Sequence, residues 1–353
     1  MTEAPEGTGS RVEALRSWHD DWRGLRVAVL GLGVTGFSVA DTLVELGAEV
    51  LVFSPSHDAR RAELLQVIGA RLIDRALDSG TADELLGFDP ELVVASPGFS
   101  PQHPLIRHVE QAGIPLWGDV ELAWRLRDKV GEPADWLVVT GSGGAGETAR
   151  LAEAMLLEGG LRTLACGNLG IPVLDAIRDP VGWDVLPVEL SSAQLHYTRS
   201  LSAWSSLCLE AGSGAVGWHG SRDAYLSATA RAYENTRVAC IYNRSDAETI
   251  TMVEEADVVE GCRAIGFDLG TPGPSDLGIV DGILVDRAFH DDRHASALEL
   301  TTVAELSEAG LGSRESVMNV LAASALVRSY GVPVAAVHDA VARMRGGGRR
   351  RSD

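Results

Sequence analysis

The chain has 353 residues, of which 45% are hydrophobic, and its formal net charge at pH 7 is −20. A chain of this length and composition buries a large core, and we expect it to divide into two or three domains. The negative charge argues against nonspecific binding to nucleic acid or to an anionic membrane, and no apolar run is long enough to span a bilayer.

Residues 1–21 form a polar segment without the apolar stretch of a secretory signal, so we expect a cytoplasmic protein. The four cysteines are far apart in the sequence and have no C-x-x-C spacing. This spacing indicates neither a zinc site nor a disulfide framework.

Residues 22–125 alternate short apolar runs with helical patterns. Strands are expected at 26–30, 48–53 and 92–95, and helices at 38–46 and 60–68. This alternation predicts a doubly wound α/β domain.

A glycine-rich turn, Gly31-Leu-Gly-Val-Thr-Gly36, joins the first of these strands to its helix. The pattern G-x-G-x-x-G in this context indicates a phosphate-bearing ligand at the helix N-terminus. Ser54 ends the second strand, where a dinucleotide-binding protein usually has an acidic residue. Because Ser54 and the nearby Arg60 also suit a 2′-phosphate, an NADP-dependent oxidoreductase stays open as an alternative.

Residues 126–312 begin with an apolar strand at 136–140, followed by a glycine-rich turn and a helical pattern. The turn, residues 141–148, fits the nucleotide-binding pattern G-x-x-x-x-G-K-T except that Glu147 replaces the lysine. A glutamate there puts a negative charge beside any bound polyphosphate. It also suits the positive end of a helix dipole, so the segment is either a structural turn or a nucleotide loop.

Further along this region, the apolar strand 185–190 has Glu189 near its end. Its carboxylate is a candidate Mg²⁺ ligand, or else it accepts hydrogen bonds from Ser191 and Ser192. A turn and helix are expected at 218–233, and a strand at 238–242 that leads to Asn243. Residues 273–282 are rich in glycine, proline and serine and predict a surface loop, followed by a short edge strand at 283–285.

An ordered set of segments resembles the Mur ligases of peptidoglycan synthesis, most closely the actinobacterial type that joins D-glutamate to UDP-N-acetylmuramoyl-L-alanine. The matching segments are residues 31–36, 96–98, 115–122, 167–170, 189–192 with Gln194, and 218–220. The resemblance implies an α/β protein with a Rossmann-like UDP-sugar domain at 22–125 and a central ATPase-type domain with a P-loop fold at 126–312. It also implies that residues 313–353 are a truncated remnant of a C-terminal α/β domain.

The resemblance also implies roles for individual residues. Its UDP-sugar-binding positions are Gly33, Val34, Thr35, Ser54, Ser96, Pro97, Gly98, Asn168, Ser191 and Gln194. The remnant of its nucleotide site consists of Gly141, Gly144, Thr148 and Asn243, with Glu189 as the metal ligand.

The sequence departs from the family pattern at positions that carry catalysis. Alignment with the family loop T-G-T-N-G-K-T-T places Ala145 at the lysine and Gly146 at the metal-binding hydroxyl, next to Glu147. Ala215 stands at a family histidine that binds a second magnesium ion, and Thr229 stands at a lysine that the family carbamylates. Since one preorganised electrostatic group contributes about 10²- to 10³-fold in rate, we expect no intact catalytic residue and no ligation.

The sequence therefore predicts a degenerate Mur ligase homologue without a certain cofactor. It is expected to bind a UDP-N-acetylmuramoyl-type small molecule or a protein partner, or to self-associate, but not nucleic acid or a membrane. The alternative is an active ligase that uses ATP and Mg²⁺ to add D-glutamate to UDP-N-acetylmuramoyl-L-alanine.

Overall fold

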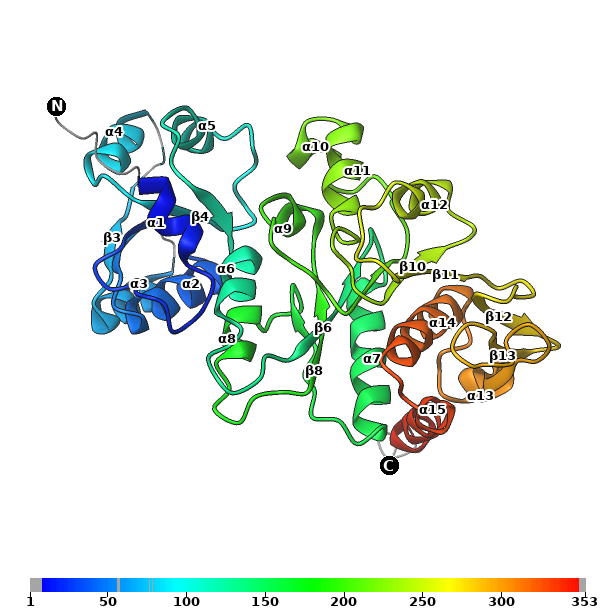
Figure 1. Cartoon of the computed structure of the whole chain (residues 1–353). Helices are drawn as coiled ribbons and strands as arrows, with labels where there is room; N and C mark the ends of the chain where they lie inside the picture. Colours follow the sequence, from blue (N-terminus) through cyan, green and yellow to red (C-terminus); the bar gives the residue numbers. More distant parts are fainter. Residues whose placement is uncertain (1–7, 56–57, 76, 78, 349–353) are drawn as a thin grey trace.

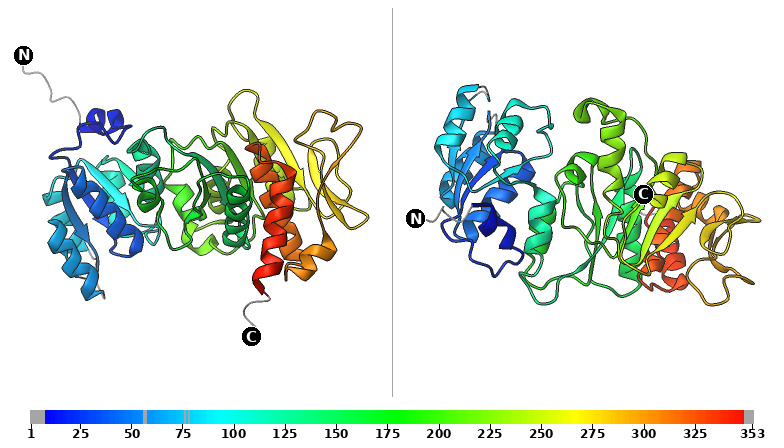
Figure 2. Two further views of the ribbon diagram at one scale, coloured as in Figure 1. Left: turned by 90° about the horizontal axis from the view of Figure 1, so that it is seen from below. Right: turned by 45° about the horizontal axis from the view of Figure 1, so that its top comes forward.

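The computed structural model describes residues 8–348 except 56, 57, 76 and 78. It contains two sheets with helices on both faces, and the two halves lie side by side in an elongated molecule (Figures 1 and 2). The expected α/β class with parallel sheets is confirmed. No described helix is both long and apolar enough to cross a membrane.

The first sheet has five parallel strands in the order β3-β2-β1-β4-β5. Its strands are β1 (Arg26–Leu30), β2 (Glu49–Phe53), β3 (Arg71–Ile73), β4 (Leu92–Ala95) and β5 (Leu116–Gly118). Its helices are α1 (Thr8–Ala14), α2 (Val34–Glu45), α3 (Ala59–Ile68), α4 (Ser79–Gly87), α5 (Pro104–Gln111) and α6 (Asp119–Leu126). The strand order reverses at β1, so the ends of β1 and β4 form the crevice where such sheets bind ligands.

The second sheet has nine strands in the order β14-β13-β12-β11-β10-β9-β6-β8-β7. Its strands are β6 (Asp135–Thr140), β7 (Cys166–Gly167), β8 (Val185–Glu189), β9 (Ser205–Cys208), β10 (Ala239–Asn243), β11 (Arg263–Phe267), β12 (Asp276–Val280), β13 (Ile283–Asp286) and β14 (Leu298–Thr302). Strands β6 to β12 are parallel, whereas β13 is antiparallel to both of its neighbours.

The helices of this half are α7 (Ala145–Glu158), α8 (Val173–Ile177), α9 (Ser192–His196), α10 (Val216–His219), α11 (Arg222–Ala230), α12 (Ala247–Glu254), α13 (Val303–Glu308), α14 (Arg314–Ser329) and α15 (Val334–Gly348). Helices α14 and α15 pack against α7, and their apolar side chains join the core of the nine-stranded sheet (Figure 1). The domain boundaries expected at residues 22, 126 and 313 stay predictions, and residues 1–7 and 349–353 lie outside the described part.

Two expectations about the segment after residue 273 are wrong. The glycine-rich stretch 273–282 contains strand β12, and strand β13 is internal because it lies between β12 and β14. A Cβ built on Gly278 would lie 2.3 Å from the Gly270 carbonyl oxygen, so close backbone packing explains a glycine within this strand.

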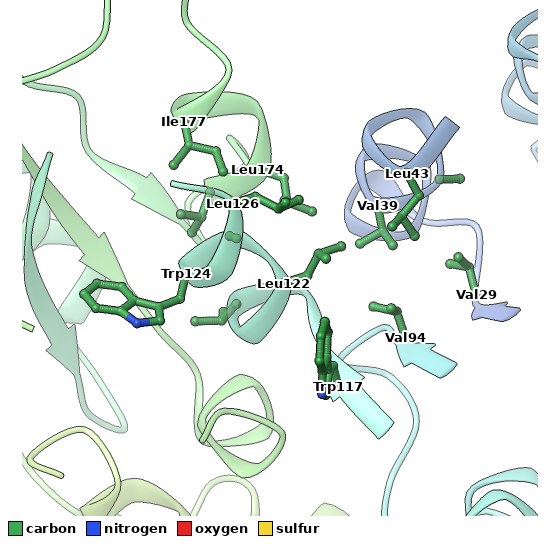
Figure 3. Packing of buried hydrophobic residues seen from close by; sticks show 14 of the residues in the cluster. Val29, Val39, Leu43, Val94, Trp117, Leu122, Trp124, Leu126, Leu174 and Ile177 are labelled. Carbon is green, nitrogen blue, oxygen red and sulfur yellow. The ribbon is translucent and has the colours of Figure 1, made fainter. Parts of the chain in front are cut away.

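The two halves share one hydrophobic cluster. Val39 and Leu43 of α2 point toward Leu122 of α6, and Leu126 of α6 lies near Leu174 of α8 (Figure 3). Helix α6 therefore belongs to the core of both halves and fixes how the two sheets sit relative to each other.

Candidate functional site

The glycine turn between β1 and α2 depends on close backbone contact. A Cβ on Gly36 would lie 2.1 Å from the carbonyl oxygen of Gly31, and Gly31 itself has a φ of +99°. No other residue type fits at Gly36 without moving the chain. The turn places Gly33, Val34 and Thr35 at the start of α2, where free backbone N–H groups favour an anion.

The loop after β4 lies against this turn. Ser96 Oγ is 2.9 Å from a Cβ built on Gly31, and it is buried without a hydrogen-bond partner among the described residues. Ser54 follows β2 at the same sheet edge and is 8% exposed. The structure therefore brings the predicted residues of the first half to one edge, because parallel strands present their carboxyl ends together.

Two side chains of the central half form hydrogen bonds to the loop that contains Pro97 and Gly98. Trp218 Nε1 donates to the Pro97 carbonyl at 2.9 Å, and the Tyr197 hydroxyl donates to the Phe99 carbonyl at 2.9 Å. Burial raises the pKa of Tyr197, with Glu110 adding to the effect, so the hydroxyl stays protonated as a donor. The two halves of the predicted precursor site are thus joined by hydrogen bonds.

A cavity of about 400 Å³ lies beside the glycine-rich loop between β6 and α7. Many of the residues singled out from the sequence line it, although they come from distant segments. They are Gly141, Gly144, Ala145, Gly146, Asn168, Glu189, Ser191, Ala215 and Thr229.

Glu189 ends β8 in this cavity and is 7% exposed. Asn168 Nδ2 donates to Glu189 Oε1 at 3.3 Å. The alternative of hydrogen bonds from Ser191 and Ser192 is not seen, because the Ser191 hydroxyl donates to Gln194 Oε1 and the Ser192 hydroxyl pairs with His219 Nε2. Burial raises the pKa of Glu189, while the Asn168 hydrogen bond and the charge of Arg150 oppose that rise. Within the described residues, no three His, Cys, Asp or Glu side chains are grouped to hold a metal ion, and a role for Glu189 in metal binding stays a prediction.

Two carboxylates border the loop. Asn319 Nδ2 of α14 donates to Glu147 Oε2 at 3.0 Å, and Ser142 Oγ donates to Glu210 Oε1 at 2.7 Å. Ala145 is 5% exposed, and its methyl group is part of the apolar core behind the loop. The loop itself therefore presents backbone N–H groups but no cationic side chain.

On the far side of the cavity, Ala215 precedes α10 and Thr229 lies on α11. Thr229 is 1% exposed, and its Oγ1 donates to the Tyr225 carbonyl at 2.9 Å. Its hydroxyl is thus already used within the helix. Threonine also lacks the amine that a carbamate requires.

Other predicted residues have structural contacts of their own. Ser191 and Gln194 form a capping box at the start of α9, and Gln194 Nε2 also donates to the buried Asp119 Oδ2 at 3.0 Å. Asn243 Nδ2 donates to the Leu209 carbonyl at 2.9 Å and lines a second cavity of about 460 Å³ beside the loop. Thr148 is fully buried and lines neither cavity. Ligand contacts at these positions stay predictions.

Sequence reasoning missed Asn319 and Glu210. Asn319 is 2% exposed and sits among the apolar residues of α14, where an amide needs a partner. A single amide among the apolar residues of this helix could have indicated from the sequence that Asn319 has a buried polar partner. Glu210 gave no comparable signal, because only the fold brings the end of β9 to the loop after β6.

Comparison with known proteins places this geometry in context. Residues 25–118 match the family described as "Mur ligase MurD-like, N-terminal domain". The UDP-N-acetylmuramoylalanine–D-glutamate ligase of Leifsonia xyli subsp. xyli is 57% identical over 95% of this chain and 67% of its own length. The ligase of the same name from Streptomyces avermitilis is 46% identical over 92% of this chain and 68% of its own length. The chain thus spans about two thirds of the curated relatives it matches.

A solved structure gives the same fold. The UDP-N-acetylmuramate:L-alanyl-gamma-D-glutamyl-meso-diaminopimelate ligase from Neisseria meningitides has a TM-score of 0.54 at 14% identity. The match covers 89% of this chain and 96% of that one. These relatives are ligases, so the oxidoreductase alternative finds no support among them.

Proposed function

The chain belongs to the Mur ligase family, and from that premise we propose that it binds a UDP-N-acetylmuramoyl-type precursor across its two halves. The observation that carries this proposal is the junction of the two halves. Trp218 and Tyr197 hold the loop at 96–99 against the glycine turn that starts α2. The cavity beside Asn168 reaches Ser192 at the start of α9, whose hydroxyl pairs with His219, the neighbour of Trp218. A sugar diphosphate suits the helix N-terminus, and its peptide end suits the polar cavity.

The chemistry of the bound precursor has two candidate outcomes. The names of the relatives favour ATP-dependent ligation of D-glutamate, because the proteins with 57% and 46% identity are both named as D-glutamate ligases. In that case the loop at 141–148 binds ATP through its backbone N–H groups, with Mg²⁺ held by Glu189.

The side chains around the loop favour binding without ligation. A polyphosphate needs cationic compensation. The carboxylates of Glu147 and Glu210 border the loop, and a nearby cation is Arg150, whose guanidinium lies 3.9 Å from a Cβ built on Gly146. We therefore propose that precursor binding is retained, and that turnover decides between ligation, which the names of the relatives favour, and binding alone.

The decisive experiment measures binding and turnover separately. Purified protein is titrated with UDP-N-acetylmuramoyl-L-alanine by calorimetry, and phosphate release is then followed with ATP, Mg²⁺ and D-glutamate. A ligand at about 100 times its Kd raises stability by about 2.7 kcal/mol, so thermal unfolding provides a second reading.

Precursor binding without phosphate release supports the binding proposal. Phosphate release that requires all four components supports the ligase instead. Folded protein that neither binds nor turns over the precursor contradicts both candidates. Asn168→Ala is the matched variant, because it removes an amide from the cavity without touching the glycine turn.

A further inference from the structure

Helices α11 and α12, labelled in Figure 1, border a groove of about 530 Å³ that is separate from the cavities described above. Leu226 and Ala230 of α11 and Met252 of α12, with Ala256 just beyond, form its apolar floor. Behind this floor lies a buried cluster that includes Tyr233. Met252 is 6% exposed and Leu226 and Ala230 are half-buried, so the floor is a small apolar surface between the two helices.

The rim of the groove is acidic. Five of its lining residues are acidic and none is basic: Asp223, Glu234, Glu248, Glu255 and Asp257. Glu248 is paired with Arg222 at 2.7 Å. The other four form no salt bridge with any residue in the described part of the chain.

Two charged neighbours act on Glu234. Burial raises its pKa, the positive charge of Arg199 lowers it, and the negative charge of Asp257 adds a smaller rise. Arg222 pairs with Glu248 and the charge of Arg199 acts on Glu234, but the lining has more carboxylates than these two cations offset, so a further cation is attracted. The rim thus attracts positive charge at the same place where the floor offers apolar contact.

We propose that this groove binds a cationic amphipathic helix of a protein partner, with its apolar stripe on the floor and its lysines or arginines against the rim. A groove between two helices suits a helical guest with apolar residues at i, i+3, i+4 and i+7. Helix α11 has nine residues, a length of about 13 Å, so two to three turns of the guest are enclosed.

Helix α11 lies between the groove and the central cavity, so binding in the groove can affect the cavity. Leu226 and Ala230 face the groove, whereas Tyr225 and Thr229 of the same helix line the cavity beside the glycine-rich loop. A partner seated in the groove therefore contacts the helix that forms one wall of that cavity.

The test uses three labelled 14-residue peptides and fluorescence anisotropy with the full chain. One peptide has leucines at helical spacing and lysines elsewhere, the second replaces each lysine with glutamate, and the third is a scrambled lysine–leucine sequence. We expect saturable binding of the first alone, weakened by added salt.

Two matched triple variants locate the site. The first triple variant should weaken binding of the first peptide at least tenfold; it combines Glu234→Gln, Glu255→Gln and Asp257→Asn. The second triple variant combines Asp291→Asn, Asp292→Asn and Glu299→Gln, which make the same change in net charge at exposed positions away from the groove. It should weaken binding of the first peptide less than twofold.

Several outcomes overturn the proposal. No saturable binding by the first peptide removes it. If both triple variants weaken binding equally, the peptide responds to the net charge of the protein and not to the groove. If the scrambled peptide binds with equal affinity, the apolar stripe is not needed for binding. Thermal unfolding of both variants verifies that they fold, so a loss confined to the groove variant supports the site.

Discussion

At the scale of single residues, four carboxyl groups lie in or next to the candidate site, and their burial ranges from full to exposed. Glu147 and Glu210 border the glycine-rich loop, Glu189 lies inside the cavity, and Asp119 is fully buried beside Gln194. Each is held by one or more neutral donors rather than by a cation alone. Single substitutions can test what these hydrogen bonds contribute.

Asn319→Ala should lower stability by about 1–3 kcal/mol, because the part-buried carboxylate of Glu147 loses the donor that α14 supplies. Urea denaturation measures the change. Glu315→Gln, an exposed substitution on the same helix, is the control and should stay within about 0.5 kcal/mol of the natural chain. Equal stability of the Asn319→Ala variant and the natural chain would show that the contact does not stabilise the fold.

Asp119 should make stability depend on pH. Burial raises its pKa from 3.8 to about 6, against hydrogen bonds from Gln194 and from backbone N–H groups that lower it. The folded chain then binds the proton more tightly than the unfolded chain between about pH 4 and pH 6. The contribution of Asp119 to the free energy of unfolding is therefore fully present below about pH 4 and is lost as the pH rises through about 6.

Asp119→Asn removes that dependence and keeps an oxygen that accepts from Gln194. We expect the stability of the variant relative to the natural chain to rise by at most about 3 kcal/mol between pH 4 and pH 7. Chemical denaturation at several pH values provides the comparison. A difference that stays constant with pH would contradict the assignment.

At the scale of elements, the turn between β1 and α2 is the most constrained part of the site. Gly36→Ala should cost about 3 kcal/mol or more, because its Cβ would lie 2.1 Å from the Gly31 carbonyl oxygen. Gly33→Ala is the matched control: its φ is −74° and a Cβ there meets nothing within 4 Å. Thermal unfolding should separate the two, and similar melting temperatures would refute the packing argument.

At the scale of the whole molecule, the shared hydrophobic cluster predicts cooperative unfolding. Leu122 of α6 is fully buried between the two halves (Figure 3), and Leu122→Ala should cost about 2–5 kcal/mol. The loss should lower one transition, seen together by tryptophan fluorescence and circular dichroism. Two separated transitions, only one of them shifted by the variant, would show that the halves unfold independently.

Local patterns in the sequence determined much of the fold and the family. The apolar runs at 92–95 and 26–30 coincide with β4 and β1, and the run at 185–190 covers β8 and extends one residue past its end, because a buried parallel strand needs continuous apolar residues. The glycine turn at 31–36 could be recognised for a similar reason, since a close backbone approach admits only glycine. The order of such segments was sufficient to indicate the Mur ligases, which the relatives confirm.

Only the tertiary structure decided which distant residues meet. Strand β12 contains a glycine and follows a turn-rich stretch, so its pairing with β11 and β13, and not its propensity, makes it a strand. The contact of Asn319 with Glu147 joins residues 172 positions apart, and no local pattern encodes it. The acidic groove between α11 and α12 likewise arises from helix packing. Acidic residues at helical spacing are common on protein surfaces, and only the packing of the two helices places an apolar floor between them.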